Sequence, residues 1–145
     1  MAVRAQSADH LASELRRVLS KLKRRLREQT GHNDLTSTQT AVLLRLEKDG
    51  PAPVSTLARA EGIRPQSMSA AVKGLLGAGL VKGTPDKRDA RQTLISLTPK
   101  CRLSLRKGRA ARQDYLASAI QKELDATQQA QLAVAIALLE RLADR

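Results

Sequence analysis

Apolar residues recur every three or four positions at both ends of the chain, as they do along amphipathic helices. The pattern predicts a first helix over about residues 9–28, with an apolar stripe formed by Leu11, Leu15, Val18, Leu19, Leu22 and Leu26. A break at residues 31–34 follows it. Near the C-terminus, a capping motif at residues 125–128 opens a last helix, whose stripe contains Leu132, Ile136, Leu139 and Leu142.

Shorter apolar periods fill the middle of the chain. Thr36 and Gln39 form a capping box that opens a helix with Val42, Leu43 and Leu46 apolar. Ser55 is expected to cap a short helix over residues 56–61, and Gly62 suits the left-handed residue that closes it. Pro65 fits the first turn of the next helix, which is expected to end at Gly79 and to turn inward Met68, Val72, Leu75 and Leu76.

A short hairpin is predicted next. Leu80 and Val81 begin its first strand, and residues 93–97 alternate as its partner across a charged loop at residues 84–91. Thr98 and Pro99 then open a helix expected to run to about Ala119.

These elements predict a mainly α fold with a small β-hairpin, in the order α-α-α-α-β-β-α-α. The short helix, the tight turn at residues 62–64 and the longer helix make a helix-turn-helix, and the hairpin that follows makes it a winged helix. We expect this core at residues 35–98, flanked by an N-terminal helix within residues 1–34 and C-terminal helices within residues 99–145.

Composition indicates a polyanionic partner. The chain has 145 residues and a formal net charge of +12, with 41% hydrophobic residues and Tyr115 as its one aromatic residue. Because stacking on aromatic rings is how most single strands are held, duplex DNA gripped by its phosphates is favoured over RNA. We expect no metal or other cofactor and no enzymatic activity, since His10, His32 and Cys101 lie far apart and no phosphate loop or nucleophile elbow is present.

A cytoplasmic protein is expected. No apolar run reaches the roughly 18 residues of a membrane span, and Cys101 has no cysteine to pair with. The polar first ten residues lack the apolar segment of a secretory signal.

A winged helix places its second helix in the major groove and its wing in the minor groove. Opposite the predicted inner stripe, Gln66 is a candidate to read adenine, and Ser67 and Ser69 are candidates for other base edges. Arg64 and Lys73 are expected to contact phosphates, and further backbone candidates at helix starts are Thr38 and Ser55.

The predicted wing carries Lys87, Arg88 and Arg91 between two aspartates. We expect Asp89 to hold the Arg91 guanidinium by a charge-assisted hydrogen bond, ready for a narrow minor groove.

Several segments together resemble the multiple-antibiotic-resistance regulator (MarR) family. They stand in register from about residue 35 to residue 100 and comprise Leu35–Gln39, Val54–Ala58, Pro65–Ser69, Leu75–Val81, Asp89–Arg91 and Ile95–Thr98. Cys101 departs from the family pattern, where glycine is usual, as does Thr40, where an aromatic residue is frequent.

The resemblance implies a transcription regulator, usually a repressor, that binds pseudo-palindromic operators as a homodimer joined by its outer helices. The apolar stripes of those helices agree with this, because something must cover them. The family's recognition positions map onto Gln66, Ser67, Ser69 and Lys73, and its wing Asp and Arg map onto Asp89 and Arg91.

The resemblance also implies a small-molecule effector, for which His10, Arg16, Arg45 and Tyr115 are candidate contacts. Cys101 could have a lowered pKa at its helix start, but a buried, inert thiol is the favoured interpretation. Two other functions remain open: a non-specific architectural protein of the nucleoid, which the charge would suit, and a winged helix that binds an acidic protein.

Overall fold

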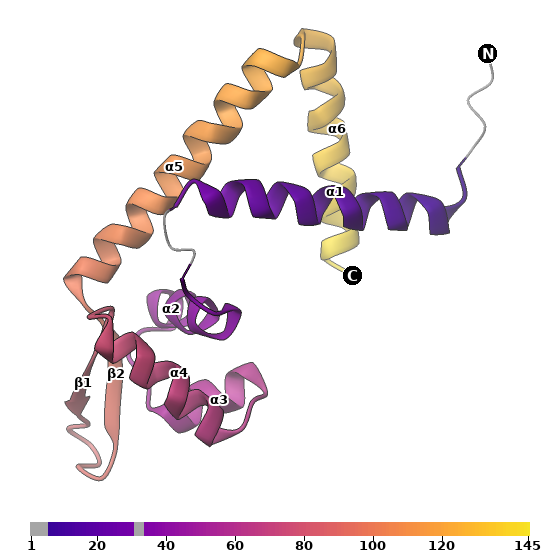
Figure 1. The fold of residues 1–145 in the computed structure, drawn as a ribbon. Coiled ribbons are helices and arrows are strands. Elements are labelled where there is room, and N and C mark those ends of the chain that lie inside the picture. The colour runs from indigo at the N-terminus through magenta and orange to yellow at the C-terminus, as the bar shows by residue number, and fades with distance from the viewer. Residues whose placement is uncertain (1–5, 31–33) are drawn as a thin grey trace. The chain divides into compact units, whose positions relative to one another are not determined.

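The computed structural model describes residues 6–30 and 34–145. Within these ranges the chain forms six helices and one two-stranded antiparallel sheet (Figure 1). The helices are α1 (Ala8–Glu28), α2 (Ser37–Asp49), α3 (Val54–Glu61), α4 (Pro65–Gly77), α5 (Pro99–Glu123) and α6 (Ala126–Ala143), and the strands are β1 (Val81–Pro85) and β2 (Thr93–Leu97). The predicted class and element order are confirmed.

The chain divides into two compact units. Unit 2, residues 32–108, holds α2, α3, α4, the hairpin and the first part of α5. Unit 1 combines residues 1–31 with residues 109–145, and so holds α1, the rest of α5 and α6.

Unit 2 has one continuous apolar core. Its fully buried side chains come from every helix of the unit: Val42 and Leu46 from α2, Leu57 from α3, Met68 and Leu75 from α4, and Cys101 from α5. The strands add Val81, Ile95 and Leu97, which are each 3% exposed. This packing fixes the position of α4 and the hairpin relative to each other.

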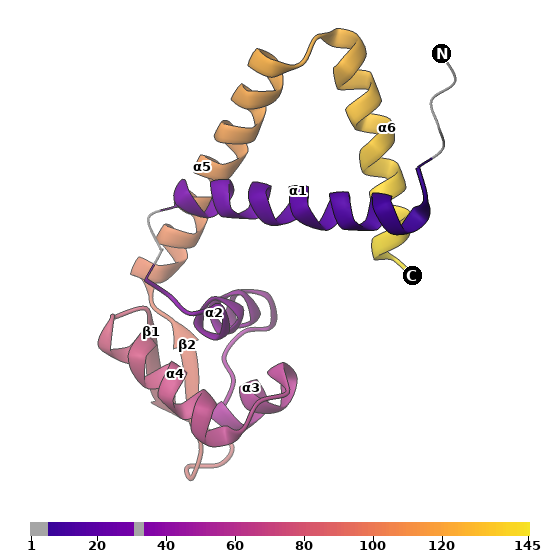
Figure 2. The same cartoon turned by 45° about the vertical axis from the view of Figure 1, so that its right-hand side comes forward.

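The hairpin also pairs with Ala52, a single residue outside the two strands. Val81 pairs with Leu97 and Pro85 with Thr93, while Ala52 exchanges both backbone hydrogen bonds with Ile95, at 3.0 and 2.9 Å. Figures 1 and 2 show that the loop joining β1 to β2 projects away from α2.

The α3–α4 turn forms as the sequence predicts. Gly62 has φ of 66°, in the left-handed region that costs glycine little, and its N–H returns to the end of α3. Ile63 donates its N–H to the carbonyl of Ala58 at 3.1 Å. Both capping boxes, at Thr36 and Asp125, are also present.

Two predictions about helix limits are wrong. α3 begins at Val54 with Pro53 as its N-cap, so Ser55 lies inside the first turn and caps nothing. α3 therefore begins two residues earlier than the sequence indicated, close after the pairing of Ala52 with Ile95. α5 continues past Ala119 to Glu123. The predicted end of α4 is confirmed, because the helix runs to Gly77 and Gly79, with φ of 71°, is the left-handed residue that closes it.

Leu76 was also wrongly assigned to the core. It is 43% exposed, whereas its neighbour Leu75 is fully buried. Met68, Val72 and Leu75 already complete the inner face of α4, and Leu76 lies one helical step beyond it. The predicted break at residues 31–34 falls mostly outside the described residues, which resume at Asp34.

Unit 1 contrasts with unit 2 because neither α1 nor α6 contains a buried residue. Leu11, Val18 and Leu22 on α1 are 53%, 47% and 39% exposed, and Ile136 and Leu142 on α6 are 47% and 63% exposed. The predicted stripes are therefore present and only partly covered in the single chain, since Leu15, Leu26, Leu132 and Leu139 are half-buried while the other stripe residues are exposed. Among the described residues, no helix combines the length and apolar character needed to cross a membrane.

Candidate nucleic-acid interface

The outer face of α4 is polar and contains no acidic residue. The five predicted contact residues, Arg64, Gln66, Ser67, Ser69 and Lys73, are all exposed. They lie on or beside α4, whose opposite face buries Met68, Val72 and Leu75. The same helix is thus anchored on one side and open to a ligand on the other.

Arg64 is the N-cap of α4, and its side chain makes no capping hydrogen bond. The first backbone N–H groups of the helix are therefore left for an external acceptor, to which a helix N-terminus also presents a favourable dipole.

The side chain of Gln39 connects α2 to α4. Its Oε1 accepts the Thr36 N–H at 3.0 Å, and its Nε2 donates to the Ala71 carbonyl at 3.3 Å. A methyl group added at Gly74 would lie 2.7 Å from this Nε2, so the glycine leaves room for the amide. The capping box was predicted from sequence, but the bond to α4 was not.

The wing tip is a loop ordered by its two aspartates. The Asp86 N–H donates to the Gln92 carbonyl at 2.9 Å and closes the loop. Asp86 Oδ1 accepts the Arg88 N–H at 2.9 Å, and Asp89 Oδ1 accepts the Arg91 N–H at 3.1 Å. Each carboxylate therefore fixes a turn in the backbone, as short acidic side chains commonly do.

The predicted role of Asp89 is corrected by this geometry. Its carboxylate binds the backbone of Arg91 and not the guanidinium, and the described residues include no ion pair between these two side chains. The donor, the Arg91 N–H, lies only two residues along the chain from the Asp89 carboxylate, so it is within easier reach than the guanidinium at the end of a long flexible side chain. Lys87, Arg88 and Arg91 are exposed on the ordered loop.

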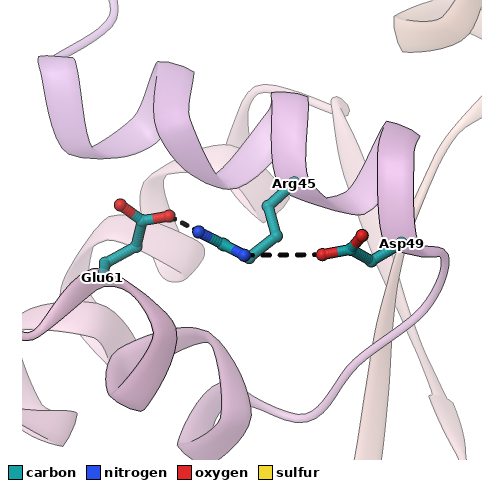
Figure 3. A network of polar contacts seen from close by, with 3 residues as sticks. All are labelled: Arg45, Asp49 and Glu61. Carbon is teal, nitrogen blue, oxygen red and sulfur yellow. Dashed lines mark hydrogen bonds and ion pairs between the residues drawn. The ribbon is translucent and has the colours of Figure 1, made fainter. Parts of the chain in front are cut away.

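Arg45 joins the first two helices of the core (Figure 3). Its Nε donates to Glu61 Oε1 at 2.9 Å and its Nη1 lies 3.4 Å from Asp49 Oδ2. The hydrogen bond that Arg45 donates to the Glu61 carboxylate raises the pKa of Arg45. Since α3 ends at Glu61, this ion pair holds the end of α3 against α2 just before the turn into α4.

The remaining candidates are placed separately. Thr38 is half-buried in the first turn of α2, and Ser55 is exposed in the first turn of α3. In unit 1, His10 and Arg16 are exposed on α1, and Tyr115 on α5 lines a wide, open groove with Gln29 and Lys122. Neither His10 nor Arg16 lines that groove, and Arg45 belongs to unit 2, where two carboxylates already bind it.

Cys101 is a buried thiol, and this part of its prediction is confirmed. It is 1% exposed, and burial raises its pKa, with the Glu47 carboxylate acting in the same direction. Thr98, which was expected only to open α5, also connects two elements. Its hydroxyl accepts the Cys101 N–H at 3.2 Å and donates to the Gly79 carbonyl at 2.8 Å, which ties α5 to the base of the wing.

No group of His, Cys, Asp or Glu side chains in the described part of the chain is arranged to hold a metal ion. What unit 2 presents instead is a helix with an open polar face beside an ordered cationic loop. These features define a winged helix-turn-helix of the DNA-binding class.

Known proteins agree with this class. The MarR family profile matches residues 35–93. The HTH-type transcriptional regulator MT0903.1 of Mycobacterium tuberculosis is 32% identical over 107 residues, which cover 74% of this chain and 75% of that protein. A transcriptional regulator of Pseudomonas aeruginosa, known from a crystal structure, is 32% identical with a TM-score of 0.82, covering 97% of this chain and 99% of its own.

The chain therefore belongs to the MarR family, and it is a DNA-binding transcription regulator. A more distant structure shares the fold: BpsR of Bordetella bronchiseptica, whose DNA binding is regulated by 6-hydroxynicotinic acid, is 20% identical with a TM-score of 0.60. It covers 100% of this chain and 99% of its own.

Proposed function

We propose that the protein is a cytoplasmic repressor that binds a pseudo-palindromic operator in double-stranded DNA as a homodimer. The observation that carries the proposal is the pairing, within one packed unit, of the exposed polar face of α4 with an ordered cationic wing. A protein that occupies an operator in this way blocks access of the transcription machinery to the same DNA.

Each contact has a chemical role in this proposal. Gln66 reads adenine with its amide, and the hydroxyls of Ser67 and Ser69 contact neighbouring base edges. Arg64 and Lys73 bind phosphates, aided by the first turns of α2 and α3 at Thr38 and Ser55. Lys87, Arg88 and Arg91 enter or border the adjacent minor groove.

The case for a homodimer rests on unit 1. A helix with an apolar stripe gains its stability from covering that stripe, yet α1 and α6 have no buried residue in the single chain. A second copy would supply a complementary surface and would set two recognition helices on one face of the duplex, about one helical turn apart.

Release by a small-molecule effector is the least direct part of the proposal. BpsR, which shares the fold, is regulated by a small aromatic acid. Here the candidate contacts are His10, Arg16 and Tyr115, while Arg45 is engaged by Glu61 and Asp49. A ligand that binds better to an arrangement unable to fit DNA would lower operator affinity.

Selection of bound sequences from a pool of random duplexes tests sequence-specific binding. We expect a palindromic motif, and we expect Gln66→Ala to relax the preference at one position of each half-site by about 1–3 kcal/mol. Gln113→Ala, in an exposed position on α5, is the matched control and should keep the motif. Equal affinity for all sequences, with a steep salt dependence, would instead indicate a non-specific nucleoid protein.

Analytical ultracentrifugation tests the dimer. Leu22→Glu places a charge in the α1 stripe and is expected to shift the protein toward monomer. Leu44, which is 48% exposed on α2, supplies the control Leu44→Glu, which should leave the dimer intact. A wild-type protein that sediments as a monomer at micromolar concentration would contradict the homodimer.

A further inference from the structure

The outward ridge of α4 has a short side chain at its middle. On the face opposite Met68, Val72 and Leu75, the helical period brings Gln66, Ala70 and Gly77 into line. All three are exposed, and the ridge is flanked by Ser67 and Gly74 on one side and by Lys73 on the other. Between the longer side chains of Gln66 and Lys73, the methyl group of Ala70 is therefore the side chain at the middle of the surface that meets DNA.

A methyl group in this position has a definite chemical preference. It neither donates nor accepts a hydrogen bond, so a base edge with polar atoms beneath it would lose water without compensation. Thymine alone among the four bases presents a methyl group in the major groove. The small residues on one flank, Ser67 and Gly74, leave room for α4 to approach closely enough for two methyl groups to touch, and Lys73 on the other flank can extend toward a phosphate.

We infer that Ala70 is a specificity-determining residue that recognises the 5-methyl group of a thymine in each half-site. Gln66 and Ala70 are one helical turn apart, about 6 Å along the axis. Successive base pairs are about 3.4 Å apart. The thymine therefore lies one or two base pairs from the adenine that Gln66 reads. This inference rests on the proposed binding of an operator by α4.

The test replaces thymine by deoxyuridine, which differs only in lacking the methyl group. Starting from the duplex obtained by selection with wild-type protein, each thymine of the half-site is replaced in turn, and the Kd is measured at fixed salt. At one position the wild type should bind about three- to fivefold more weakly, the effect expected for losing one buried methyl contact. Ala70→Gly should show no further loss at that position, because it has no methyl to contact.

Two further variants separate recognition from folding. Replacing alanine by glycine at an exposed helix position lowers the stability of the helix by roughly 1 kcal/mol. Ala60→Gly, at an exposed position on α3, is therefore the control for this loss of stability. It must still bind the deoxyuridine duplex more weakly than the thymine duplex. Ala70→Ser keeps helix propensity closer to alanine and, like Ala70→Gly, should abolish the preference for thymine.

The inference is overturned if the wild type binds every deoxyuridine duplex as tightly as the thymine duplex. It is also overturned if replacing thymine by deoxyuridine weakens binding by Ala70→Gly and Ala70→Ser as much as it weakens binding by the wild type. Failure to select any sequence would refute the proposed function itself. A selected operator without a deoxyuridine effect would refute only the role of Ala70.

Discussion

Gln39 donates from its side-chain nitrogen to the Ala71 carbonyl at 3.3 Å, so one side chain caps α2 and also contacts the middle of α4. The capping box is local, but the second bond crosses between helices far apart in sequence. The position of α4 is therefore supported by a side chain from α2.

Gln39→Ala should lower the free energy of unfolding by about 1–2 kcal/mol, because it removes a cap and a partly buried hydrogen bond. Urea denaturation followed by circular dichroism measures the loss. Gln113→Ala, a glutamine exposed on α5, should change stability by less than about 0.5 kcal/mol. Equal effects of the two variants would show that the contact with α4 contributes nothing.

Gly77→Ala should stabilise the protein more than Gly74→Ala. A methyl at Gly74 meets Gln39 Nε2 at 2.7 Å, whereas one at Gly77 meets nothing within 4 Å. Replacing glycine in a helix gains up to about 1 kcal/mol where space allows. Gly77→Ala should therefore have the full gain, and in Gly74→Ala the gain should be offset because the methyl displaces the Gln39 amide from its hydrogen bond to the Ala71 carbonyl.

A double-mutant cycle isolates that clash. In a Gln39→Ala background the obstructing amide is absent, so Gly74→Ala should become stabilising, like Gly77→Ala. Strict additivity of Gln39→Ala and Gly74→Ala would contradict the geometry.

Asp89→Asn and Asp89→Ala should separate the turn from the charge in the wing. The asparagine amide oxygen can still accept the Arg91 N–H, and one negative charge near the DNA is lost. We expect Asp89→Asn to bind the operator as tightly as the wild type or more tightly, and Asp89→Ala to bind more weakly. Fluorescence anisotropy at several salt concentrations measures the operator affinity of both variants. Weak binding by Asp89→Asn would indicate that the charge of Asp89 acts on the Arg91 guanidinium after all.

Arg91→Ala should reduce operator affinity roughly 10- to 100-fold, the loss expected for a charge-assisted contact. If Arg91 binds a phosphate or a narrow minor groove, the slope of log Kd against log salt should also fall by about one. The exposed Arg59 at the end of α3 provides the control Arg59→Ala. Matching losses from Arg91→Ala and Arg59→Ala would indicate only a general effect of charge.

Cys101 should react with a thiol reagent only as fast as the core opens, since it is 1% exposed and burial raises its pKa. The unfolded thiol ionises near pH 8.5, and the folded thiol ionises higher. The folded state therefore binds more protons above that pH, and stability should fall as the pH rises. Urea denaturation of wild type and Cys101→Ala between pH 7.5 and 9.5 checks the sign: the alanine variant should lack this part of the decline.

Local signals of the sequence determined most of the architecture. The capping boxes at Thr36 and Asp125, the left-handed Gly62 and the alternation over residues 93–97 each depend on neighbours in the chain, and each is present as predicted. The exposed positions of Gln66 and Lys73 also followed from the helical period of α4. Such features can be predicted because their hydrogen bonds close within a few residues.

Only the tertiary structure decided the contacts between elements. Pairing of Ala52 with Ile95 set the start of α3, and packing of Leu75 into the core left Leu76 outside it. The ion pair of Arg45 with Glu61 and the bond of Gln39 to Ala71 join segments 16 and 32 residues apart. The spacing of residues along the chain does not predict such pairs, because they depend on how the helices pack against one another. That packing is determined by all the side chains of the core together.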